Sequence, residues 1–338
     1  MTLILHIAAD DVRAGRRTPV DLVNACLDRI DRYEPRVKAW VFVDRDGARR
    51  EAERLTDELR RGQYRGPLHG IPIGVKDIFD VFDWPTAAGS RLWANSIARH
   101  DAAVVAKLRQ AGAIFLGKTV TTQYASFDPP PTRNPWNLER TPGGSSSGSA
   151  AAVACGMCYG ALASQTGGSI TRPAAYCGVP GCKPTWGRVS KVGVVPLAPS
   201  MDHVGVMAGC VRDLAILLQI IGGFDPRDPD CSPGDMPDLT ARLAEGAPSS
   251  RAPRLGRLRG LFEDQAAPSV RAEMQRAHDR FVARGAQVVD VALPASFSEV
   301  LARHRTVMAV EAAAYHEPRL HRHPEDYGPN ITKLLREG

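Results

Sequence analysis

The most informative stretch of this chain runs from Pro142 to Lys183, PGGSSSGSAAAVACGMCYGALASQTGGSITRPAAYCGVPGCK. It holds two serine clusters behind glycine pairs, Gly143-Gly144-Ser145 and Gly167-Gly168-Ser169, and the last serines of the two are 24 positions apart. A glycine pair allows backbone conformations closed to other residues and lets N–H groups approach a ligand. Two such loops side by side predict a reaction centre.

A lysine upstream can complete that centre. The run Ile71-Pro-Ile-Gly-Val-Lys76-Asp is apolar and typical of a strand, so desolvation there would lower the pKa of Lys76 and make it a base. A serine hydroxyl needs an adjacent base to attack an amide carbonyl. Ser145 can pass the proton from Ser169 to Lys76 and later return it to the leaving amine.

The second glycine loop predicts an oxyanion hole. The backbone N–H groups of Thr166, Gly167, Gly168 and Ser169 precede a helical segment. They can converge on the oxygen that becomes negative in a tetrahedral intermediate.

The motifs GVKD, PGGSSSGSAAAVA and QTGGSITRPAAYCGVPGCKPTWGRVS resemble those of the amidase signature family of Ser-Ser-Lys amide hydrolases. The resemblance continues in family order through GKTVTTQYA, TRNPWN and APSMDHVGVMAGCVRDLAILL. It implies that Lys76 is the catalytic lysine, Ser145 a bridging serine in a cis peptide after Gly144, and Ser169 the nucleophile. The chain departs from many relatives at Gln165, where they carry Asp.

The family resemblance implies one domain over residues 1–338, an α/β fold arranged as a three-layer α/β/α sandwich around a mixed, mostly parallel sheet. It also implies that the family's C-terminal portion is lacking. The proline- and glycine-rich residues 223–253 are expected to form a surface connection. Apolar periodicity predicts strands at 71–75, 113–116, 159–163, 192–195, 255–258 and 287–291, and helices near 18–33, 46–61, 101–111, 145–157, 211–222, 267–284 and 297–314.

The expected activity is hydrolysis of a small linear amide through an acyl-enzyme, with no cofactor and no metal. Arg172, three residues after Ser169, is a candidate for binding a substrate carboxylate through its planar fork. Malonamidases resemble this chain in having an arginine at that offset. The alternative is that Arg172 only ties its loop to a buried carboxylate.

Two other functions stay open. Within the family, the chain can be the glutaminase-type subunit of a tRNA-dependent amidotransferase, which needs partner subunits. Outside it, the chain can be a non-catalytic scaffold stabilised by zinc, because Cys155, Cys158, Cys177 and Cys182 approach zinc-ribbon spacing. Packing of these cysteines in an apolar interior is the simpler interpretation.

Two further pattern matches do not indicate the sites that they resemble. Residues 112–119 fit a phosphate-binding loop, but their middle is itself expected to be a strand. Ser146 sits in a G-x-S-x-G pattern, yet the preceding NPWNLERTPG does not resemble a core strand.

The composition favours a cytoplasmic enzyme. The chain is 43% hydrophobic, has 7 cysteines without a secretory signal, and has no apolar run of membrane-spanning length. Its net charge of +6 comes from scattered arginines, so neither nucleic acid nor a membrane is an expected partner. A small-molecule amide is the expected partner, and a homodimer is one possible assembly.

Overall fold

Local capping chemistry fixes where the early helices begin. The hydroxyl of Thr18 accepts a hydrogen bond from the N–H of Asp21, and the Asp21 carboxylate accepts one from the N–H of Thr18. Proline at the next position suits the first helical turn. The helix α2 (Pro19–Val37) therefore starts where the sequence predicts, although it runs further.

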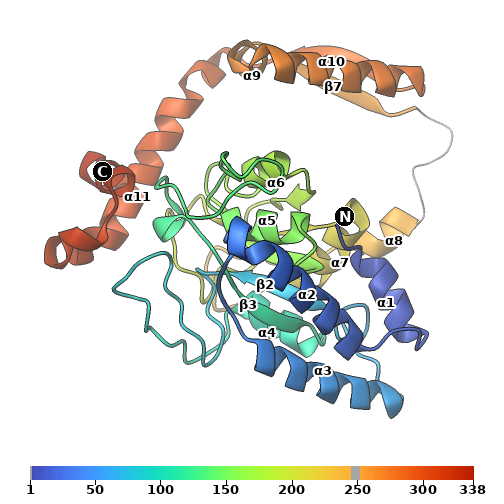
Figure 1. Cartoon of the computed structure of the whole chain (residues 1–338). Coiled ribbons are helices and arrows are strands. Elements are labelled where there is room, and N and C mark those ends of the chain that lie inside the picture. Colours follow the sequence, from blue (N-terminus) through green and yellow to red (C-terminus); the bar gives the residue numbers. More distant parts are fainter. Residues whose placement is uncertain (1, 245–251) are drawn as a thin grey trace. The chain divides into compact units, whose positions relative to one another are not determined.

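The computed structural model describes residues 2–244 and 252–338. They divide into two compact units, one made of Met1–Thr240 with Val307–Gly338 and the other of Ala241–Thr306 (Figure 1). Whether both belong to one domain over 1–338 stays a prediction. Along the described part of the chain, no helix is long and apolar enough to cross a membrane.

The first unit contains a six-stranded mixed sheet in the order β1-β3-β2-β4-β6-β5. Its strands are β1 (Trp40–Val43), β2 (Pro72–Lys76), β3 (Ile114–Thr119), β4 (Gly160–Gln165), β5 (Gly181–Cys182) and β6 (His203–Ala208). The central strands β3, β2 and β4 are parallel, whereas β1, β6 and β5 pair antiparallel with their neighbours.

The predicted α/β sandwich with a mixed sheet is confirmed, but the parallel part is smaller than expected. Parallel neighbours need a crossover connection, usually a helix, whereas antiparallel neighbours do not. Residues 183–202, which link β5 to β6, are all described and contain no helix. The chain therefore returns antiparallel at that edge.

The first unit also contains helices, and several of them pack on this sheet or on one another. The helices of this unit are α1 (Leu5–Arg13), α2, α3 (Arg45–Arg60), α4 (Ala103–Gln110), α5 (Ser147–Ala154), α6 (Thr171–Cys177), α7 (Val211–Ile221), most of α11 (Val300–Arg322) and α12 (Pro329–Glu337), with short 3-10 turns η1 (Gln123–Ala125) and η3 (Pro324–Asp326).

Helix α5 lies unusually close to the strands. Its residues Ser147 to Val153 are all buried. A Cβ added at Gly148 would lie 2.1 Å from the carbonyl oxygen of Ala39, so only glycine fits there. This small-residue helix places the loop that precedes it against the ends of the central strands.

The second unit is a small βαβ arrangement. It comprises β7 (Arg254–Arg259), α9 (Leu261–Gln265), α10 (Pro268–Ala283), β8 (Gln287–Ala292), η2 (Ala295–Glu299) and the start of α11, with β7 and β8 parallel. Of the expected surface connection at 223–253, residues 239–244 form α8 (Leu239–Ala244), and residues 245–251 lie outside the described residues.

Most predicted elements are present with shifted ends, but one predicted strand is wrong and three strands were missed. Residues 192–195 make only an isolated bridge, between Phe79 and Val194. Pro196 follows directly and has no N–H with which to extend a ladder. The strands β1, β5 and β6 were not predicted.

Candidate active site

Lys76 is the last residue of β2 and lies at the carboxyl-terminal edge of the sheet, where the parallel strands end. Because Val75 pairs with Leu162 of the neighbouring parallel strand β4, the register brings Lys76 beside Ser164, two positions further along β4. Polar groups from parallel strands commonly meet at this edge. The sheet itself thus assembles part of the site.

The Lys76 amine is buried among hydroxyl groups. Its Nζ lies 2.7 Å from Ser145 Oγ and 2.8 Å from Ser164 Oγ, and the side chain is fully buried. Removal from water disfavours the charged amine and lowers the pKa of Lys76 to about 7, against a smaller opposing effect of the Asp202 charge. A substantial share of Lys76 is therefore neutral near pH 7 and able to accept a proton.

The two glycine-serine loops meet through the backbone. The Gly144–Ser145 peptide bond is cis, and Ser145 is fully buried. The N–H of Ser146 donates to the carbonyl oxygen of Ser169, 3.3 Å away, which holds the loops together. Ser169 retains 8% exposure, so it lies at the boundary between the interior and solvent.

Gln165 organises the predicted oxyanion loop from inside. Its Oε1 accepts hydrogen bonds from the N–H groups of Ile170 and Thr171, at 2.8 and 2.9 Å, while its Nε2 donates to the carbonyl oxygen of Gly167 at 3.0 Å. An ionised aspartate has no proton to donate in this way. The glutamine here therefore ties both ends of the loop.

Two polar residues of this region were missed as contributors by sequence reasoning. Ser164 accepts a hydrogen bond from Lys76 Nζ, and the partly buried Asp202 accepts one from the hydroxyl of Thr166. The other carboxylate oxygen of Asp202 accepts from the N–H groups of Leu197 and Ala198, at 2.8 and 3.1 Å. Only weak signals in the sequence pointed to these two residues. Ser164 is a serine inside the apolar strand β4, and Asp202 is a carboxylate directly before β6.

Arg172 lies over the predicted oxyanion loop rather than in a buried ion pair. Its N–H donates to the Gly168 carbonyl oxygen at 2.9 Å, and a Cβ added at Gly168 would lie 3.0 Å from its Nη2. The residue is exposed, and no carboxylate among the described residues forms an ion pair with it.

A cavity of about 220 Å³ borders the site on the side of Ser164 and Asp202. Its other walls are mainly apolar and include Val195, Leu197 and Val204. Ser145, Ser169 and Arg172 do not line it. The cavity is thus next to Ser164, one of the two hydroxyl partners of Lys76, and separate from the loop that carries Ser169.

The residues of the competing motif matches form a strand or pack in the interior. Residues 114–119 form β3, where buried Lys118 pairs with Asp77 at 2.9 Å. Ser146 is fully buried and donates to the carbonyl oxygen of Ser164 at 3.1 Å. Cys155, Cys158 and Cys177 are buried free thiols, and Cys182 is a partly buried one.

The α/β fold thus buries Lys76 between the hydroxyl groups of Ser145 and Ser164 at the ends of its central strands. The chain belongs to the Amidase family, whose sequence profile matches residues 21–335.

Individual relatives agree with this assignment. A glutamyl-tRNA(Gln) amidotransferase subunit of Roseiflexus sp. (strain RS-1) is 41% identical over 306 residues, which are 87% of this chain and only 62% of that longer protein. The native peptide amidase of Stenotrophomonas maltophilia superposes with a TM-score of 0.86 at 33% identity, covering 99% of this chain and 74% of that one. A structure described as a vestigial protein complex that reveals the origins of an s-triazine catabolic enzyme reaches 0.91 at 33% identity, covering 99% and 73%.

Proposed function

We propose that this chain hydrolyses a linear carboxamide to a carboxylic acid and ammonia or an amine through a serine acyl-enzyme. The observation that carries the proposal is the fully buried Lys76 amine, 2.7 Å from Ser145 Oγ, with its pKa lowered to about 7. A neutral lysine beside a hydroxyl relay is what activation of a serine requires. The relatives in the Amidase family support the same reaction class.

In the proposed reaction, Ser169 Oγ attacks the carbonyl carbon while its proton passes through Ser145 Oγ to Lys76 Nζ. The N–H groups of Thr166, Gly167, Gly168 and Ser169 stabilise the oxyanion. The proton then returns along the same path to the leaving nitrogen, and the C–N bond breaks. Water attacks the acyl-enzyme by the same relay and releases the acid. No cofactor enters these steps.

We propose further that Arg172 favours small amides that carry a carboxylate. The guanidinium lies next to Gly168 of the oxyanion loop, is exposed, and has no ion-pair partner among the described residues. A planar guanidinium can bind a carboxylate through two parallel hydrogen bonds. An amide with a carboxylate one or two carbons from the scissile carbonyl would use it.

The proposal is tested with a serine-directed fluorophosphonate probe and a panel of amides. The probe should label Ser169, and labelling should stop in Ser169→Ala. Ammonia release from the panel then defines the substrate. Labelling at Ser146 or Cys177 in place of Ser169 would show that the assignment of the nucleophile is wrong.

A second candidate function is the glutaminase-type subunit of a tRNA-dependent amidotransferase. The similarity to the Roseiflexus amidotransferase protein, 41% over 306 residues, favours it. Glutaminase activity measured alone and with partner subunits separates the two functions, because activity only in the complex supports the amidotransferase. A non-catalytic zinc scaffold predicts neither activity nor probe labelling.

Location and assembly are also proposals. The 7 free cysteines favour the reducing cytoplasm. A homodimer is tested by light scattering of the purified chain, in which a mass of one chain would exclude it under those conditions.

A further inference from the structure

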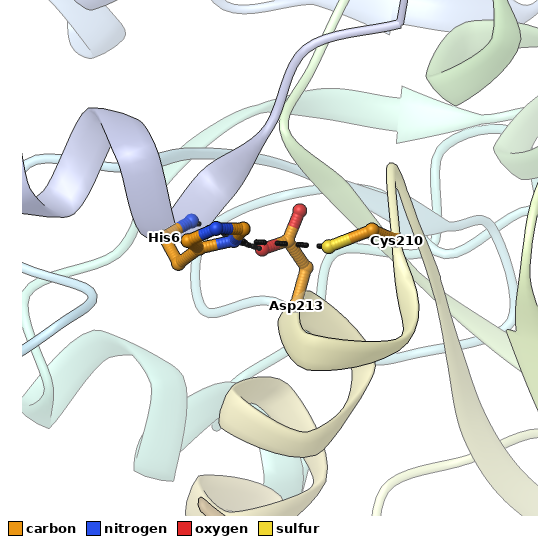
Figure 2. A group of neighbouring side chains, drawn as sticks. All are labelled: His6, Cys210 and Asp213. Atoms are coloured by element: carbon orange, nitrogen blue, oxygen red, sulfur yellow. Dashed lines mark hydrogen bonds and ion pairs between the residues drawn. The ribbon is translucent and has the colours of Figure 1, made fainter. Parts of the chain in front are cut away.

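Three side chains of metal-binding type meet where two helices begin. His6 lies in the first turn of α1, Cys210 directly precedes α7, and Asp213 lies in the first turn of α7. The His6 Nδ1 is 2.7 Å from Asp213 Oδ1 and 3.7 Å from Cys210 Sγ. Figure 2 shows the histidine ring and the sulfur on opposite sides of the carboxylate, and one ligand atom of each residue lies within 4.8 Å of the other two.

Helix capping explains only part of this cluster. The Asp213 carboxylate accepts hydrogen bonds from the N–H groups of Leu5 and His6, at 2.9 and 3.0 Å, so it caps α1 from another helix. Cys210 occupies the N-cap position of α7 but makes no side-chain cap hydrogen bond. Serine, threonine, asparagine or aspartate would cap better. A thiol here, turned toward a histidine more than 200 positions away, is not explained by capping.

We propose that His6, Cys210 and Asp213 bind a thiophilic divalent cation of the zinc class. Tetrahedral zinc, with bonds of about 2.0 Å to nitrogen and about 2.3 Å to sulfur, separates these two ligands by about 3.5 Å. The 3.7 Å between His6 Nδ1 and Cys210 Sγ already fits. The 2.7 Å from His6 Nδ1 to Asp213 Oδ1 has to open by roughly half an ångström.

The charge and solvent access of the cluster also suit this cation. A thiolate and a carboxylate together balance two positive charges. The His6 side chain is 23% exposed whereas that of Asp213 is fully buried, so the ion has one open side for a water as its fourth ligand.

Besides this small shift of His6 against Asp213, binding requires proton loss and a tautomer change. The Cys210 thiol releases its proton to solvent, and His6 takes its Nε2–H form so that the Nδ1 lone pair faces the ion. Asp213 keeps both hydrogen bonds to the N–H groups of α1. The ion would join the start of α1 to the start of α7 and take no part in amide hydrolysis.

The test uses Co²⁺ as a spectroscopic probe on the full chain after treatment with EDTA. The parent should develop the near-ultraviolet charge-transfer absorption of a cobalt–thiolate bond. Cys210→Ser should abolish that absorption, and His6→Gln should weaken Co²⁺ binding at least about tenfold. Cys182→Ser is the matched control, because Cys182 is also only partly buried and should leave the absorption intact.

Thermal unfolding separates the metal site from simple capping. Zinc should raise the midpoint of the parent and not that of Cys210→Ser. In EDTA, Cys210→Ser should be at least as stable as the parent, since serine is the better N-cap. If Cys210→Ser fails to fold, His6→Gln carries the same comparison.

Retention of the cobalt–thiolate absorption in Cys210→Ser would overturn the proposal. So would a parent that binds no Co²⁺, or one whose midpoint zinc leaves unchanged. These outcomes are independent of amide hydrolysis, because none of the three residues belongs to the lysine and serine cluster.

Discussion

The two compact units of the chain differ in how far their apolar side chains are buried. In the first unit, the central strands β2, β3 and β4 and the helix α5 are almost completely buried. In the second, the only buried residue among those described is Ala286. Seven of its large apolar side chains are 45–55% exposed, namely Leu258, Phe262, Val270, Met274, Phe281, Val282 and Val289.

The second unit is held mainly by backbone pairing and surface charges. β7 and β8 form a parallel ladder, and Arg257 pairs with Asp290 at 2.7 Å. Exposed ion pairs contribute little to stability. A region with few buried apolar contacts opens at a lower free energy than a packed core. The site residues predicted from the sequence all lie in the well-packed unit.

The largest expected effect lies at the proposed nucleophile. Ser169→Ala should reduce kcat for amide hydrolysis by a factor of about 10⁴ or more, because members of a catalytic triad act as a unit. Steady-state ammonia release measures it. The second unit provides the control, Ser298→Ala, which removes only a hydrogen bond from Oγ to the carbonyl oxygen of Ala295.

Ser298→Ala should leave kcat within about twofold of the parent, since an exposed substitution of this kind changes little. Substantial residual activity in Ser169→Ala would remove Ser169 from its proposed role. A large loss in Ser298→Ala would show that catalysis depends on the second unit.

A matched pair of leucines tests the packing contrast directly. Leu116 in β3 is fully buried and Leu258 in β7 is 45% exposed, and both lie on strands. Leu116→Ala should lower the free energy of unfolding by about 2–5 kcal/mol. Leu258→Ala should lower it by less than about 1 kcal/mol. Urea unfolding gives both values, and equal losses would mean that Leu258 is buried in solution.

The sequence predicted most elements of both units, but it did not predict their burial. The strand at 255–258 and the helix near 267–284 follow from local pattern, and both are present. Apolar periodicity reports which face an element can bury, not whether another element covers that face. Whether the apolar side chains of the second unit are buried therefore depends on contacts between elements, which the local pattern of one segment does not reveal.

The site shows the same division between local and long-range information. Lys76, Ser145 and Ser169 were identified from short motifs, and the structure brings Lys76 within 2.7 Å of Ser145. The contact between Lys76 and Ser164 depends on the register of β2 against β4, which one sequence does not reveal. The hydrogen bond between Asp202 and Thr166 likewise joins loops 36 positions apart.

The buried lysine makes stability depend on pH. The unfolded chain keeps the Lys76 proton until near its ordinary pKa of 10.5, whereas the folded chain loses it near pH 7. The unfolded state therefore binds more protons between these values, and the free energy of unfolding of the parent should rise with pH there, by up to about 1.4 kcal/mol per pH unit.

Lys76→Met removes this dependence, so its stability relative to the parent should be highest at pH 6–7 and should fall steadily towards pH 10. Urea titrations at several pH values measure the difference. Lys333→Met, at an exposed lysine, is the control and should show no such trend. A difference for Lys76→Met that does not vary with pH would mean that Lys76 is not desolvated.

The smallest expected effect concerns substrate choice at Arg172. Arg172→Lys keeps the positive charge but loses one arm of the fork, so KM for a carboxylate-bearing amide should rise about three- to tenfold. KM for a neutral amide of equal size should change little, and kcat should be nearly constant for both. Arg271→Lys, in the exposed second unit, is the matched control and should leave both KM values unchanged. Loss of a hydrogen bond to the substrate carboxylate can affect only the amide that carries a carboxylate. Equal increases in KM for the acidic and neutral amides would therefore mean that Arg172 shapes the loop over Gly168 and does not bind the carboxylate.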